Sequence, residues 1–155
     1  MNKMKKFFSK MVVVFVTTVA MAFPSFAETS ADSAVLQNEA VAAFNSINEI
    51  RKQNGLNEIR WMDELGHATI ERAEEITVKQ SHERPDGSAW YTLAPDYLFG
   101  ENFADGYDTA NDVVNAWMLS PAHMENILNP YYTGGNIQIV KVNDRCYWVN
   151  EFYED

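Results

Sequence analysis

Apolar residues recur at helical spacing in the first half of the sequence, separated by polar residues. The repeating positions are Val41, Phe44, Ile47 and Ile50. This pattern predicts an amphipathic helix that begins near Val35 and buries one face. Gly55 follows the last apolar position, where a residue with positive φ commonly ends a helix. We therefore expect the first helix to end at Gly55.

A second helix is expected between Asp63 and about Lys79. Its stripe of residues three or four positions apart comprises Leu65, Ala68, Arg72, Ala73 and Ile76. Asp63 precedes the stripe and is predicted to cap the helix, because a short carboxylate can accept a hydrogen bond from a free backbone N–H. His67 lies off the stripe, so we expect it to be exposed and without a chemical role.

Residues 80–108 are rich in Pro, Gly, Asp and aromatic residues and are predicted to form a long irregular segment with a turn at residues 84–87. Loops of this length in a compact domain are more often functional than idle. Two short helices should follow, at residues 109–119 and 121–128. Ser120 should cap the second of them, with its hydroxyl accepting from the backbone N–H of His123.

The end of the chain is predicted to form a β-hairpin. Residues 136–140 and 146–152 have the composition of strands, and Asn143-Asp144 suits the turn between them. Trp148, Asn150 and Phe152 should share one face of the second strand. Helices followed by strands predict the α+β class rather than a parallel α/β sheet.

The first residues have the features of a secretory signal peptide, with four lysines before an apolar run at residues 11–23. Cleavage is predicted after Ala27, which leaves residues 28–37 as a short flexible lead-in and residues 38–155 as one domain. The apolar run is shorter than the roughly 20 residues that a spanning helix needs, so a membrane anchor is the less favoured alternative. We expect no membrane span after cleavage, and a secreted or envelope-associated protein.

Charge narrows the classes of partner. The sequence beyond Ala27 holds all 22 acidic residues and 8 of the 12 basic ones, a formal charge of −14. Such a surface repels phosphate groups, so nucleic-acid binding is not expected. Cys146 is the single cysteine and cannot form an internal disulfide. It is interpreted as a buried strand thiol, with an intermolecular bridge as the alternative.

Five segments, taken together, resemble the bacterial branch of the CAP superfamily (SCP/PR-1-like proteins). They are residues 56–61 leading into 71–75, Ser81-His82-Glu83-Arg84-Pro85-Asp86-Gly87-Ser88, Gly100-Glu101-Asn102-Phe103-Ala104, residues 116–128 and residues 147–152. The resemblance implies an α-β-α sandwich with a central antiparallel sheet. It also implies a polar cleft, whose residues correspond here to His82, Glu101 and His123.

The cleft residues point to a candidate site. Two imidazoles and a carboxylate suit Zn²⁺ or another divalent cation, so His82, Glu101 and His123 are candidate metal ligands as well as candidate catalytic residues. Each has a structural alternative, such as holding its own loop or helix in place. Where eukaryotic members have a second glutamate this sequence has Ser120, which weakens mechanisms that need two carboxylates. A nucleophilic Ser120 is disfavoured because no strained elbow motif surrounds it.

The resemblance implies no single reaction, and three functions stay open. The first is a binding module for a small ligand, a glycan or a protein partner. The second is a metal-assisted hydrolase of peptide or cell-wall material, in which Glu101 acts as general base. The third is a structural protein of the envelope. The absence of an established reaction favours the binding module. The missing second carboxylate also counts against the hydrolase, although a histidine could serve as its base.

Overall fold

The fold is described by a computed structural model for residues 30–155. The predicted signal peptide, residues 1–27, lies outside this range. Within the range, no helix is both long and apolar enough to cross a membrane. The helices are α1 (Ser30–Gln53), α2 (Gly66–Val78), α3 (Ala110–Leu119) and α4 (Pro121–Ile127), with 3-10 turns η1 (Asp63–Leu65) and η2 (Trp90–Leu93). The strands are β1 (Arg60–Trp61), β2 (Gly100–Asp105), β3 (Tyr132–Val142) and β4 (Arg145–Glu154).

The strands form one open sheet in the order β1-β3-β4-β2. β3 and β4 form the predicted hairpin, and β2 lies antiparallel to β4. Asn143 and Asp144 have positive φ values of 49° and 60°, which is the conformation that a two-residue hairpin turn requires. β1 is the exception to the antiparallel arrangement, because it pairs with β3 in parallel. The sheet is therefore mixed, with an antiparallel majority.

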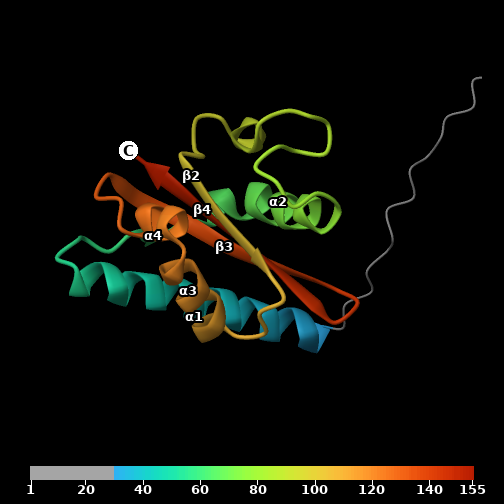
Figure 1. The fold of residues 1–155 in the computed structure, drawn as a ribbon, viewed down its shortest axis with the longest axis horizontal. Helices are drawn as coiled ribbons and strands as arrows, with labels where there is room; N and C mark the ends of the chain where they lie inside the picture. Colours follow the sequence, from blue (N-terminus) through green and yellow to red (C-terminus); the bar gives the residue numbers. More distant parts are fainter. Residues whose placement is uncertain (1–29) are drawn as a thin grey trace, which may run out of the picture.

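Helices cover both faces of this sheet, which makes the fold an α-β-α sandwich of the α+β class, as expected. Figure 1 shows α2 on one side of the strands and α1, α3 and α4 on the other. Trp148 and Phe152 alternate with Val149 and Glu151 along β4, so β4 is buried on both faces. We call the two sides the α1 face and the α2 face.

The α1 face holds the main apolar core. Phe44 and Ile47 from α1, Trp117 from α3, and Ile137 and Trp148 from the sheet are all buried in one cluster. Strands β3 and β4 of this sheet approach each other closely at Gly135, where only glycine fits. A Cβ atom on Gly135 would lie 2.5 Å from the backbone oxygen of Glu151. The apolar core therefore holds the sheet on the side away from α2.

The observed α1 ends as predicted, with Gly55 at a positive φ of 74°, but it differs from the prediction at its beginning and along its buried stripe. It begins at Ser30, so residues 30–37, expected to form a lead-in, are helical, and Leu36 packs against the core. Val41, expected on the buried stripe, is 39% exposed. The reason is geometric: residues three apart are rotated by about 300°, so a run of such steps drifts around the helix. The buried stripe contains Ala40 and Ala43 instead.

The predicted cap of the second helix was also wrong. Asp63 begins the 3-10 turn η1, and α2 starts only at Gly66. The Asp63 carboxylate accepts a hydrogen bond from the indole N–H of Trp61 at 2.9 Å instead of capping α2. The end of α2 at Val78 and the exposure of His67 agree with the prediction.

Arg51, fully buried at the end of α1, holds the chain that follows α4. Its guanidinium donates to the backbone oxygens of Ile127, Asn129 and Tyr132 at 2.8–3.1 Å. These carbonyls end α4 and begin β3, where backbone acceptors have no partner within a helix. Arg51 thereby fixes the position of α4, the helix that carries His123.

Candidate functional site

Glu101 lies at the centre of the polar region on the α2 face. It belongs to β2 and pairs in register with Glu151 of β4. Arg72, from the buried face of α2, donates to both of its carboxylate oxygens, from Nε at 2.6 Å and from Nη2 at 3.1 Å. The side chains of Arg72 and Glu101 are both completely buried. Such a bidentate contact fixes the position of the carboxylate and neutralises its charge.

His82 contacts the same carboxylate from the irregular segment that follows α2. Its Nδ1 lies 2.7 Å from Oε1 of Glu101, and its ring packs edge-on against Phe103 with 4.9 Å between centroids. Burial alone would raise the pKa of Glu101, but the hydrogen bonds from His82 and Arg72 lower it. Glu101 is therefore a carboxylate, which can only accept, so Nδ1 of His82 carries the hydrogen. The side chain of His82 remains 54% exposed.

His123 is the third residue of α4, as predicted, and is half-buried. Its backbone oxygen accepts a hydrogen bond from the side-chain amide of Asn102 at 3.0 Å. Asn126, one turn later, donates to the Asn102 side chain at 2.8 Å and to the backbone oxygen of Glu101 at 3.2 Å. These bonds tie α4 to β2 beside Glu101.

Burial lowers the pKa of His123, and the nearby charge of His82 lowers it further. The two imidazoles are thus close enough that charging one makes charging the other more costly. The structure brings His82 and Glu101 into contact and ties α4, which carries His123, to β2 beside them, but it does not leave all three residues open to solvent. His82 is exposed and His123 partly so, whereas Glu101 is covered.

Glu151 is a buried carboxyl group that the sequence analysis did not identify. Its register partners are Glu101 on β2 and Asn136 on β3, and the Asn136 amide donates elsewhere, to the backbone oxygen of Met62. No N–H group donates to either carboxyl oxygen of Glu151. Burial, and then the negative charge of Glu101, raise the pKa of Glu151 well above its usual range. We infer that Glu151 is protonated and donates its O–H to Glu101.

Arg72 was placed on the buried stripe of the second helix but was given no role. A charged residue on an otherwise apolar stripe is the signal that could have identified it, since such residues are almost never fully buried unless they are paired. Glu151 carries the same signal, because it lies between buried residues in a strand covered on both sides. Its partner, however, could be found only from the strand register.

The predicted three-ligand metal site does not fit this arrangement. Both oxygens of Glu101 are held by Arg72 and His82, and no solvent reaches its side chain. Within residues 30–155, no group of three or more His, Cys, Asp and Glu side chains is placed to hold a metal ion. What the geometry supplies is the His82–Glu101 pair, in which Glu101 is a hydrogen-bond partner of His82, and the half-buried His123 on α4.

The hydroxyl of Ser120 does not make the predicted bond. Ser120 does occupy the position before α4, but its side chain caps no backbone N–H, and its backbone oxygen accepts from Met124 at 2.9 Å. The extended backbone at this residue, with φ −98° and ψ 115°, ends α3 and starts α4 within one residue. Ser120 is therefore a junction between two helices.

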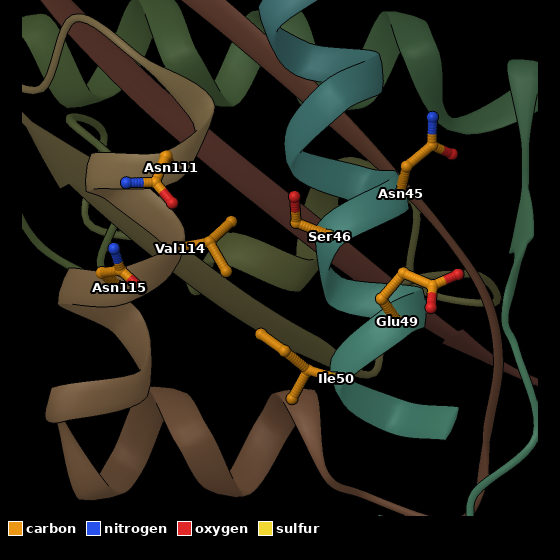
Figure 2. A pocket seen from close by; sticks show the side chains of 7 residues that line it. All are labelled: Asn45, Ser46, Glu49, Ile50, Asn111, Val114 and Asn115. Atoms are coloured by element: carbon orange, nitrogen blue, oxygen red, sulfur yellow. The ribbon is translucent and has the colours of Figure 1, made fainter. Parts of the chain in front are cut away.

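Three surface pockets lie along α1, and none is lined by His82, Glu101 or His123. One of them, of about 290 Å³, lies between α1 and α3 (Figure 2). Figure 2 shows Ile50 and Val114 between the helices, with the amides of Asn45, Asn111 and Asn115 around them. This hollow carries no histidine, and its one carboxylate, Glu49, is exposed and forms an ion pair with Lys52 at 3.0 Å. We therefore place the candidate site at the three predicted residues and not in a pocket.

Comparison with known proteins supports this fold assignment. An uncharacterized protein of Bacillus subtilis, YkwD, is 28% identical over 131 residues, which is 80% of this chain and 50% of that protein. The chain thus spans about half the length of the curated relative that it matches. An extracellular protein with an SCP domain from Bacillus anthracis superposes with a TM-score of 0.71 at 19% identity, over 84% of this chain and 45% of that one.

A second solved structure, an outer surface protein of Borrelia burgdorferi, gives a TM-score of 0.66 at 23% identity, over 77% of this chain and 95% of that one. At these identities the two structures support the fold alone. The sequence profile of the cysteine-rich secretory protein family, CAP, matches residues 44–152. The match covers most of the chain and contains His82, Glu101 and His123. The chain therefore belongs to the CAP family.

Proposed function

We propose that this protein is a non-enzymatic binding module that acts outside the cytoplasm, at the cell envelope. The observation that carries the proposal is the enclosure of Glu101. A general base must reach the water that it activates, and its pKa should lie near the working pH. Glu101 is completely buried, its oxygens are held by Arg72 and His82, and its pKa is lowered. Glu101 therefore organises His82 instead of activating water.

The location rests on two supports. The first residues have the features of a signal peptide. Two proteins of similar structure are an extracellular protein and an outer surface protein. Because Glu101 is buried, His82 and His123 are the polar groups of this site that a ligand can reach. A small molecule, a glycan or a protein partner could use such donors and acceptors.

The test is to mix the protein with purified bacterial cell-wall sacculi. We expect it to sediment with the sacculi and to release no soluble fragments over many hours. A hydrolase would release fragments, and His82→Ala and His123→Ala would each abolish that release without unfolding the domain. Fragment release with this dependence would overturn the proposal, and so would failure to sediment. Heat-unfolded protein serves as the control for non-specific adsorption.

A further inference from the structure

Three aromatic side chains meet at the surface where the segment before β2 passes the end of β4. Tyr97 stacks on Tyr153 with 5.9 Å between centroids and 27° between planes, and Phe99 meets Tyr153 edge-on at 6.0 Å. We call Tyr97, Phe99 and Tyr153 the aromatic platform. It lies outside the His82, Glu101 and His123 site, and Arg60 covers the Tyr153 ring at 5.2 Å from its centroid.

The aromatic platform is held in place by the fold. Leu98, between the two exposed rings, is buried in a cluster with Met62 and Leu65. The backbone N–H of Leu98 donates to Ala94 at 3.0 Å, and that of Phe99 donates to Phe152 at 2.9 Å. Tyr97 and Phe99 are therefore exposed, at 47% and 46%, on a fixed backbone. A ligand that binds there does not have to order a loose segment, which lowers the cost of binding.

The exposed area is suited to a small ligand. A buried aromatic side chain covers about 150–250 Å², so two half-exposed rings offer roughly 200 Å². A stable protein interface needs about 800 Å² from each partner. The aromatic platform is too small for such an interface, but the exposed rings of Tyr97 and Phe99 offer about the area that one or two sugar rings can cover. Of the other exposed aromatic residues in the described part of the chain, Tyr91 meets Trp90 edge-on at 5.8 Å, whereas Tyr131 has no ring paired with it.

The charges beside the aromatic platform are balanced. Arg60 forms an ion pair with Asp155 at 3.7 Å, and both side chains are more than half exposed. A guanidinium only donates hydrogen bonds and a carboxylate only accepts them, so together they match hydroxyl groups, which do both. The net charge of −10 for the whole chain disfavours an anionic ligand. We propose that the aromatic platform binds an uncharged oligosaccharide, an inference that rests on the proposed binding function and names its ligand class.

The experiment titrates ¹⁵N-labelled protein with two neutral probes, the β-1,4-linked tetramers of N-acetylglucosamine and of glucose, and follows amide chemical shifts. We expect at least one probe to bind and the shifts to concentrate at residues 97–99 and 153. Tyr97→Ala and Phe99→Ala should each weaken binding roughly 3- to 10-fold, the loss expected for one aromatic contact. Tyr97→Phe keeps the ring and should retain most of the affinity.

Tyr131→Ala is the matched control, because Tyr131 is 70% exposed but makes no ring contact with Tyr97, Phe99 or Tyr153. It should leave the affinity unchanged. The inference is overturned if neither tetramer binds at millimolar concentration, if the shifts map to His82 and His123, or if the platform variants bind like the control. Shifts at these residues that depend on protein concentration, or on added neutral lipid vesicles, would assign the aromatic platform to self-association or to a membrane instead. If sedimentation with sacculi persists in those cases, the binding function stands without this site.

Discussion

The two faces of the sheet are stabilised by different physical means, although the same strands form both. On the α1 face, Ile137, Trp148 and Phe152 pack among apolar side chains of α1 and α3. On the α2 face, next to the apolar contacts of α2, Glu101 and Glu151 are buried carboxyl groups in register with each other, and the buried Arg72 pairs with Glu101. Apolar burial is nearly independent of pH, whereas a buried charge network is not. The comparison teaches that the family site is part of the structure that holds the sheet to α2.

The largest loss of stability on the α2 face is expected when the positive charge of Arg72 is removed. Arg72→Met should lower the free energy of unfolding by about 3–5 kcal/mol, because it leaves Glu101 buried without its ion-pair partner. The double variant Arg72→Met/Glu101→Gln should recover part of this loss, because the uncompensated charge is gone. Urea unfolding at pH 7 measures both. Equal stabilities for the two variants would show that the ion pair is not what Arg72 contributes.

The matching change on the α1 face is Ile137→Ala. Ile137 is fully buried, so truncation should cost about 2–5 kcal/mol through lost burial and the cavity that remains. This loss should be the same at pH 5 and pH 8, since no titrating group is involved. Urea unfolding at the two pH values is the measurement. A loss that changes with pH would mean that the two faces are coupled through the sheet.

Glu151→Gln sharpens the comparison through pH. The folded-state pKa of Glu151 lies above its unfolded value, so its contribution is complete below about pH 4.3 and is lost as pH rises toward the folded-state pKa. In that window the wild-type protein should lose about 1.4 kcal/mol per pH unit relative to Glu151→Gln. Unfolding curves from pH 5 to pH 8 test this. Glu64→Gln, at an exposed position in η1, controls for the loss of a carboxyl group. Parallel curves for wild type and Glu151→Gln would contradict the inference that Glu151 is protonated and donates to Glu101.

The smallest effect is expected for His82→Ala. The imidazole is half-exposed, so its contact with Glu101 should contribute less than about 1 kcal/mol. The pKa of His123 should nevertheless rise, because the second cause of its lowering is removed while burial remains. An NMR titration of the His123 ring proton measures the change. An unaltered pKa would place the two imidazoles too far apart to interact.

The sequence predicted the helices and turns that depend on residues close together in the chain. The helix predicted at residues 109–119 corresponds to α3, and the turn residues Asn143 and Asp144 located the hairpin correctly. β2 was missed because its buried residues include Glu101 and Asn102, whose polar groups are satisfied by other parts of the chain. β1 was missed because two residues show no periodicity.

Of the candidate site, the sequence supplied three residues but not their environment. The family motifs indicated His82, Glu101 and His123; the structure shows His82 in contact with Glu101, and α4, which carries His123, bonded to β2 through Asn102 and Asn126. The role of Glu101 was misjudged, because its burial depends on Arg72 reaching across from α2, at a separation of 29 residues. Glu151 becomes visible only once β2 and β4 are placed in register. Long-range pairing of this kind leaves no local pattern.

The position of β4 in the sheet also constrains how the protein is made. It pairs with β3 on one side and β2 on the other, and it is the last strand in sequence order among the described residues. A growing chain would therefore leave β2 and β3 without this partner until β4 has left the ribosome. The sheet, and with it the arrangement around Glu101, can assemble only after synthesis of this segment is complete.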